Sequence, residues 1–82
     1  MTIRKEIGNR LRVTREGMGI SQVSMADQAA ISLTTWRKYE RGVTTPTADI
    51  LREIALILNV SADWLLCLTP PKEPGEEEDF DV

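Results

Sequence analysis

The chain has no histidine and only one cysteine, Cys67, among its 82 residues. A single thiol cannot close an internal disulfide, which fits a reducing compartment. Without an imidazole beside it, that thiol offers neither a Cys/His nucleophile nor a set of zinc ligands. The sequence therefore predicts a protein that is not an enzyme and that needs no metal or other cofactor.

Long apolar runs are also missing. No run approaches the about 20 apolar residues that cross a bilayer, and the N-terminal sequence MTIRKEIGNR lacks the apolar stretch of a secretory signal. We therefore expect a cytoplasmic protein with no membrane contact. The length allows one domain with a single small core.

An excess of positive charge is absent, because the formal net charge is −3. The charge is unevenly placed, however. Residues 1–70 carry nine basic and seven acidic side chains, a balance of +2, whereas residues 71–82 carry one basic and six acidic, a balance of −5. The segment PPKEPGEEEDFDV has too few apolar groups to offset its ordering entropy. We expect a folded domain over residues 1–69 and an acidic, Pro-containing disordered tail or linker over residues 70–82.

Helix start and stop signals recur along the folded part. Hydroxyl residues that can accept from the first free N–H groups precede four segments, namely Ser21, Ser32, Thr47 and Ser61. Stop signals follow the segments, namely Gly17 and Gly19, Gly42, Asn59, and Pro70 with Pro71. No run alternates with period two for long enough to indicate a strand. The sequence predicts an all-α fold with helices near residues 3–16, 22–29, 33–41, 48–58 and 62–67.

Apolar spacing within these helices predicts the core. Ile3, Ile7 and Leu11 recur every four residues and form one stripe. The other expected core residues are Val23, Met25, Ala26, Ala29, Ile50, Leu51, Ile54, Ala55, Ile57, Leu58, Leu65 and Leu66. Trp64 is an exception, because a tryptophan near the end of a domain can instead bury a partner's surface.

The predicted helix over residues 33–41 has two unlike faces. Trp36 and Tyr39, three residues apart, would anchor it inward. The face left outward carries Leu33, Thr34, Arg37, Lys38 and Arg41. Arg and Lys can bond guanine O6 and N7, and Thr or Leu methyl groups can pack on the thymine methyl. Solvated helices also carry charges, so spacing alone leaves the role of this face open. The two short helices joined by a tight turn over residues 21–42 favour a helix that enters the DNA major groove.

At this point the sequence resembles the Cro/C1-type helix-turn-helix domains of phage repressors and related bacterial regulators, the XRE family. The resemblance runs from about Ile7 to Leu66 and rests on linked motifs in order: I-G-N-R-L-R-x-x-R, S-Q-V-S-M-A-D-Q-A, W-R-K-Y-E-R-G, P-T-A-D-I-L-R-E-I-A and N-V-S-A-D-W-L-L. It implies a compact five-helix bundle of the lambda repressor-like type. It also implies a sequence-specific transcriptional regulator, a repressor that binds a palindromic double-stranded DNA operator as a homodimer in a bacterial cell or a phage-infected host.

The resemblance implies roles for individual residues. The base-reading positions are Leu33, Thr34, Arg37 and Lys38. Backbone contacts would come from Gln22, Ser32, Arg41, Thr44, Thr45 and Thr47, and Gln22 would also brace the recognition helix. Arg15 and Glu40 match a salt-bridged pair under that helix. Ala26 matches the small residue at which the two helices approach closely, so that a larger side chain there would force them apart. Trp36 and Tyr39 would support the helix from inside.

The sequence departs from the family pattern at three positions. Ala30 stands where the turn usually has glycine or asparagine, and a left-handed alanine costs about 1 kcal/mol. Trp36 is bulkier than the usual aliphatic residue. Leu33 replaces a side chain that is often polar, which favours methyl contact there over hydrogen bonding.

Two alternatives stay open from the sequence. The domain could be an antitoxin or another partner-binding module, with a protein surface at residues 62–67 or at Phe80 in the acidic tail. It could also be the N-terminal DNA-binding part of a longer self-cleaving repressor. Trp64 is the candidate for a dimer interface. The sequence does not tell which operator is bound, what signal relieves binding, or whether the outcome is repression or activation.

Overall fold

The structure is a computed structural model that describes residues 2–68. Its elements, in order, are α1 (Ile3–Gly17), α2 (Gln22–Gln28), α3 (Leu33–Arg41), α4 (Ala48–Leu58) and α5 (Ala62–Leu65). No strand occurs within these residues, and the predicted all-α, five-helix fold is confirmed. Helix α5 ends two residues earlier than predicted, and α2 one residue earlier. The predicted tail over residues 70–82, with Phe80, lies outside the described residues.

Side-chain caps explain where most of the helices begin. The hydroxyls of Ser21, Ser32 and Ser61 each accept a hydrogen bond, 3.0 Å long, from the backbone N–H three residues on, as predicted. Thr47 occupies the cap position of α4 but makes no side-chain cap bond, so that part of the prediction is wrong. Thr2 caps α1, accepting from the backbone N–H of Lys5 at 3.3 Å, and this cap was not predicted.

Left-handed residues end the helices or shape the turns. Gly42 (φ 75°) and Asn59 (φ 57°) follow α3 and α4 as predicted. Ala30 has φ 61°, which confirms the expected left-handed alanine between α2 and α3. Cys67 also takes a positive φ, of 60°, and nothing in the sequence pattern indicated it.

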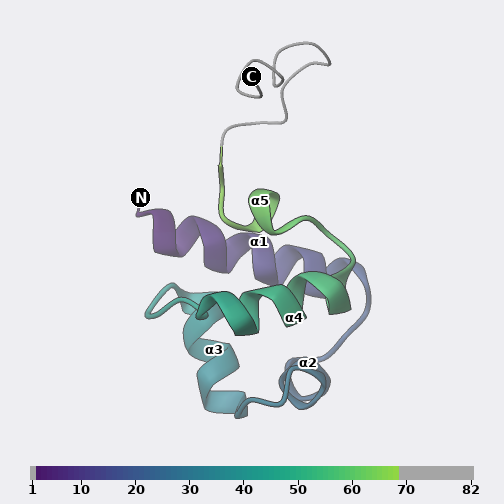
Figure 1. The fold of residues 1–82 in the computed structure, drawn as a ribbon. Coiled ribbons are helices and arrows are strands. Elements are labelled where there is room, and N and C mark those ends of the chain that lie inside the picture. Colours follow the sequence, from purple (N-terminus) through teal and green to yellow (C-terminus); the bar gives the residue numbers. More distant parts are fainter. Residues whose placement is uncertain (1, 69–82) are drawn as a thin grey trace.

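The helices surround one core (Figure 1). Helix α3 packs against both α1 and α2, and α5 packs against α1 and α4. The largest fully buried side chains are Trp36, Leu11, Met25, Ile54, Leu58 and Leu65. Each helix contributes at least one of them, so the short helices α2 and α5 are held by tertiary packing rather than by their own propensity.

Three residues predicted for the core are exposed instead. Val23 is 62% exposed, although Ala26, three residues on and on the same side of α2, is buried. Ile3 is 56% exposed in the first turn of α1. Leu66 is 38% exposed because α5 has already ended at Leu65, its buried neighbour. Periodicity predicts which side of a helix is apolar, but not where along the helix a partner stops covering it.

Gly8 marks the closest approach of α1 to α3. A methyl group at this position would lie 2.5 Å from the carbonyl oxygen of Glu40 and closer still to the carbonyl oxygen of Tyr39. Backbone atoms cannot move aside as a flexible side chain can. The absence of a side chain at Gly8 therefore lets the backbone of α3 lie directly on α1.

We predict that Gly8→Ala lowers the free energy of unfolding by about 1–3 kcal/mol through overpacking. Gly17→Ala is the matched control, because nothing lies within 4 Å of a methyl group at Gly17. That change should be neutral or stabilising, since alanine favours a helix over glycine by up to about 1 kcal/mol. Urea denaturation followed by circular dichroism measures both. Equal stability of the two variants would contradict the close approach.

Candidate nucleic-acid interface

Helices α2 and α3, joined by residues 29–32, form the helix-turn-helix unit of the fold. The side chains of Thr34, Arg37, Lys38 and Arg41 are exposed along α3, and Leu33 is half-buried at its start. On the other side of the same helix, Trp36, Tyr39 and Glu40 are buried. The structure thus brings the predicted base-reading residues to one outward face, with Leu33 at its edge.

The predicted backbone-contacting residues flank this face. Arg41 ends α3, and the loop of residues 42–47 follows it with Thr45 and Thr47 exposed and Thr44 half-buried. The hydroxyl of Ser32 accepts from the backbone N–H of Thr35 at 3.0 Å and donates to its hydroxyl at 2.9 Å. Ser32 remains exposed, so its second lone pair still faces solvent. Gln22 differs from the rest, because its amide turns toward the buried side of α3.

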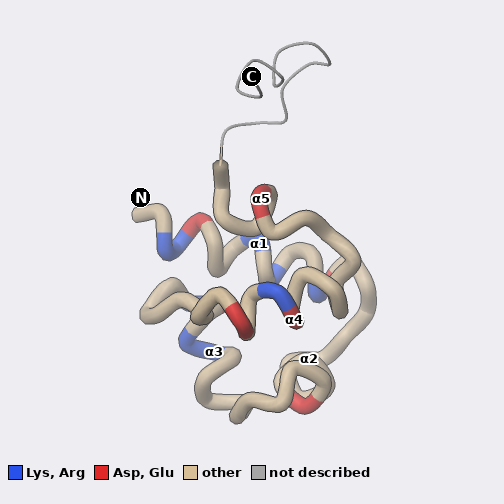
Figure 2. The backbone as a smooth tube through the Cα atoms, in the orientation of Figure 1, with Lys and Arg blue, Asp and Glu red and all other residues tan. Residues whose placement is uncertain are grey.

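Positive charge in the helix-turn-helix unit belongs to α3. The sequence of α2, QVSMADQ, contains no lysine or arginine and one aspartate. Figure 2 shows the basic residues on α1, α3 and α4 and an acidic residue on α2. Because Glu40 is buried, the exposed face of α3 presents three cations without a facing carboxylate of its own helix. A partner that prefers this face is therefore anionic.

A buried ion pair lies directly under that face. Arg15 is 8% exposed and Glu40 is 9% exposed. The Nε of Arg15 donates to Oε2 of Glu40 at 2.5 Å, and its Nη2 donates to Oε1 at 3.2 Å. The structure therefore contains the expected Arg15–Glu40 pair, with two hydrogen bonds that fix the relative orientation of α1 and α3.

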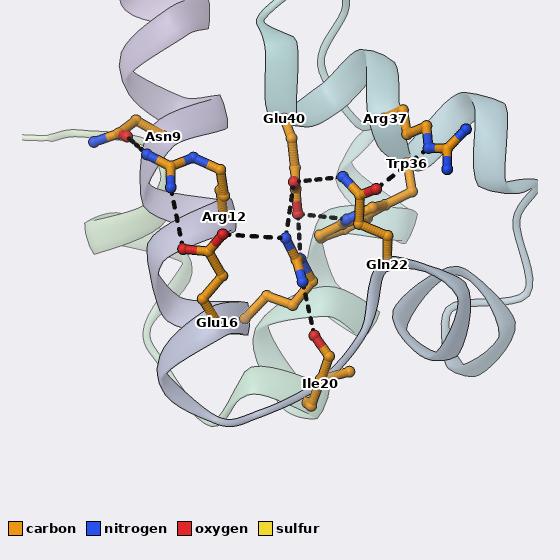
Figure 3. Close-up of polar contacts among 9 residues, drawn as sticks. Asn9, Arg12, Glu16, Ile20, Gln22, Trp36, Arg37 and Glu40 are labelled. Atoms are coloured by element: carbon orange, nitrogen blue, oxygen red, sulfur yellow. Dashed lines mark hydrogen bonds and ion pairs between the residues drawn. The ribbon is translucent and has the colours of Figure 1, made fainter.

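Glu40 has two further donors (Figure 3). The Nε2 of Gln22 donates to Oε1 at 2.9 Å, and the indole Nε1 of Trp36 donates to Oε2 at 2.6 Å. The carboxylate thus accepts four hydrogen bonds from three residues, and the remaining Nη1 of Arg15 donates to the carbonyl oxygen of Ile20 at 2.8 Å. A buried carboxylate is tolerated where its lone pairs are satisfied in this way. One buried group therefore joins α1, α2 and α3.

Tyr39 and Ala26 are buried where α2 and α3 meet the core. The ring of Tyr39 meets that of Trp36 edge-on, with centroids 6.1 Å apart. Burial raises the pKa of the Tyr39 hydroxyl above its usual value. Ala26 is 3% exposed, and its carbonyl oxygen accepts from the backbone N–H of Ile31 at 3.0 Å across the turn. Its small side chain suits the close packing of α2 against α3.

A second exposed region lies at α5, away from this face. Trp64 is 38% exposed, with the guanidinium of Arg10 4.9 Å from its ring centroid. The Nη1 of Arg10 also donates to the carbonyl oxygen of Trp64 at 2.8 Å. Leu66 and Leu68 are exposed beyond it. The neighbouring Cys67 is half-buried, and burial raises the pKa of its thiol.

Several contributors to the site were missed by sequence reasoning. Gly8 and the hydrogen bonds of Gln22 and Trp36 to Glu40 were not predicted. The indole N–H of a buried tryptophan needs an acceptor, and Glu40 lies four residues after Trp36, one helical turn away. That spacing could have indicated their contact. Nothing in the sequence indicated that Gly8 meets the backbone of α3.

Comparisons with known proteins agree with this geometry. A family model described as a helix-turn-helix domain matches residues 8–69. The cryptic phage CTXphi transcriptional repressor RstR of Vibrio cholerae is 42% identical over 60 residues, covering 73% of this chain and 54% of that protein. The uncharacterized HTH-type transcriptional regulator YazB of Bacillus subtilis is 36% identical over 66 residues, covering 80% of this chain and 91% of that protein. The chain spans about half the length of the first three curated relatives that it matches.

Solved structures show the same fold. The P22 c2 repressor protein, crystallised in complex with a synthetic operator, aligns with a TM-score of 0.71 and 27% identity, covering 77% of this chain and 92% of that one. The clp gene regulator ClgR of Corynebacterium glutamicum aligns with a TM-score of 0.73 and 22% identity, covering 82% and 87%. The second likeness concerns the fold alone.

The fold and the family match define the class. The chain belongs to the Cro/C1-type family of helix-turn-helix domains, whose relatives are named as transcriptional regulators and repressors. These relatives are not named as enzymes. No helix within residues 2–68 is long and apolar enough to cross a membrane.

We predict that Glu40→Gln lowers the free energy of unfolding by about 3–5 kcal/mol, because it leaves the buried guanidinium of Arg15 with only the more exposed carboxylate of Glu16, 3.7 Å away, among the described residues. Glu53→Gln is the control. Glu53 pairs with Arg52 at 3.4 Å, but both side chains are more than half exposed, so that change should stay within about 0.5 kcal/mol. Urea denaturation gives both values. A Glu40→Gln variant as stable as Glu53→Gln would show that the buried pair does not hold the fold.

Proposed function

We propose that this domain binds a palindromic double-stranded DNA operator as a homodimer and represses transcription inside the bacterial cell. The observation that carries the proposal is the exposed face of α3, with Thr34, Arg37, Lys38 and Arg41, held on the buried Glu40 network. A helix of this kind enters the major groove and contacts base edges. The name of the RstR relative as a repressor and the operator complex of the P22 c2 relative support the proposal.

The proposed interface has two kinds of contact, those to base edges and those to phosphates. Arg37 and Lys38 would bond guanine, while Thr34 and Leu33 would pack methyl groups on thymine. Phosphate contacts would set the register of the domain on the duplex. The candidates for those contacts are Gln22, Ser32, Arg41, Thr44, Thr45 and Thr47.

The proposed dimer would place two α3 helices about 34 Å apart, in successive major grooves on one side of the duplex. Trp64, Leu66 and Leu68 form the exposed apolar surface beside α5 that would join the two copies. We propose residues 1–69 as the DNA-binding domain and residues 70–82 as a tail or linker, whose −5 charge would repel DNA.

We predict that selection from a random duplex pool, followed by sequencing, enriches a two-fold symmetric motif. The affinity of the protein for this motif should fall as the salt concentration rises, since each phosphate that the protein neutralises releases counterions. A folded protein that enriches no motif at low salt would contradict sequence-specific binding. Attention would then pass to a protein partner at α5 or at the acidic tail.

We also predict that Trp64→Ala weakens the dimer on the operator, because it removes the exposed aromatic ring from the apolar surface beside α5. Val13→Ala, an exposed apolar residue on α1 that is 49% exposed, is the control and should leave dimerisation unchanged. Sedimentation of the wild type and the two variants, each with a duplex that carries the full palindromic site and with one that carries a single half-site, measures binding to the two duplexes. A loss on the full site only would support the interface, whereas equal binding by all three proteins would rule out Trp64.

A further inference from the structure

Gln22 connects the buried network to the exposed face of α3. Its Nε2 donates to Oε1 of Glu40 at 2.9 Å, and its Oε1 accepts from Nε of Arg37 at 3.2 Å. Figure 3 shows the glutamine between the two charged side chains, with the far end of Arg37 pointing away from it. One half-buried amide at the start of α2 thus contacts both the inner and the outer side of the recognition helix.

The orientation of this amide follows from the chemistry of Glu40. An ionised carboxylate only accepts hydrogen bonds, and Arg15 and Trp36 already donate to it from the other sides. The amide of Gln22 must therefore turn its NH₂ group inward. Its carbonyl oxygen then faces outward, where it accepts but cannot donate. The outer position favours a cation with an N–H group in reach, and Arg37 supplies one.

The contact leaves the guanidinium of Arg37 partly fixed and partly free. Its Nε is engaged by Gln22, while the two Nη groups extend away into solvent. Those two groups are the pair that matches O6 and N7 of guanine. Lys38, the neighbouring cation on the same face, is exposed, and its side chain makes no hydrogen bond or ion pair with residues 2–68. Of the two, Arg37 is therefore the one presented in a defined direction.

We propose that Gln22 is a specificity-positioning residue, which orients Arg37 so that its Nη groups bond guanine in the major groove. This inference rests on the proposed function and assigns to Gln22 a role in base choice beyond a phosphate contact. The orientation originates in the buried carboxylate of Glu40 and passes through a single neutral amide to the exposed cation.

The test compares the base preferences of four proteins, namely the wild type, Gln22→Met, Arg37→Lys and the variant with both changes. The preferences are measured by selection from a random duplex pool and by competition between duplexes that differ at one base pair. Arg37→Lys keeps the positive charge but loses the two Nη groups. The guanine whose preference falls in this variant is therefore the one that Arg37 contacts. We expect Gln22→Met to lower the preference for that guanine on the order of tenfold, with little further loss in the double variant. Gln28→Met is the control and should leave the profile unchanged, because within residues 2–68 the amide of Gln28, in the same helix, hydrogen-bonds only to Ser24, at 3.1 Å.

Other outcomes decide against the inference in distinct ways. If Gln22→Met weakens all duplexes equally and leaves the base profile unchanged, Gln22 contacts phosphate or supports the fold, and the inference is overturned while the proposed function stands. If the wild type enriches no motif, the proposed function fails, and the base-reading role of Arg37 fails with it.

A measurement on the free protein keeps the contact testable by itself. NMR of the arginine Nε–H groups should show slower exchange at Arg37 in the wild type and in Gln28→Met than in Gln22→Met. Gln22→Asn, which withdraws the amide by one methylene group, should behave like Gln22→Met and serves if the methionine variant does not fold. Equal exchange at Arg37 in all four proteins would overturn the contact.

Discussion

The buried carboxylate of Glu40 is the constraint on which the rest of the structure depends. A charge removed from water is tolerated only where partners satisfy it, and here the partners come from α1 and α2 as well as from α3 itself. Moving any of these helices relative to the others would break at least one of the four hydrogen bonds. The apolar core holds the helices together, but the charged centre sets how they are turned relative to one another.

Much of the fold could be predicted, because its signals are local. Helix starts are indicated by hydroxyl groups that can cap the first turn, at Ser21, Ser32 and Ser61. Helix ends are indicated by residues that tolerate a positive φ, Gly42 and Asn59. Helical spacing likewise separates Trp36 and Tyr39 from the outward side chains of α3. The Arg15–Glu40 pair came from resemblance rather than from pattern, since 25 residues of sequence separate its members.

The features that could not be predicted depend on what another element does. Gly8 has nothing unusual in its own helix, and its importance comes from the carbonyl groups of α3 that lie against it. Val23 belongs to a short helix whose outer side lacks a cover, which apolar spacing cannot reveal. Gln22 was expected to contact phosphate and to brace the recognition helix, but nothing local indicated that one end of its amide would bond Glu40 and the other Arg37. Such side chains acquire their roles only when three helices are in place.

Because the domain carries little net charge, the orientation of Arg37 by Gln22 matters more for the affinity for DNA. With a balance of only +2 over residues 1–70 and no cation on α2, long-range attraction contributes little, so affinity for DNA must come from a few well-placed groups. Fixing a free arginine side chain costs up to about 2 kcal/mol of conformational entropy. Where a contact in the folded protein already restrains part of that side chain, the cost falls on folding rather than on binding. In the role proposed for Gln22, this contact would favour the approach to DNA in which the Nη groups of Arg37 meet guanine.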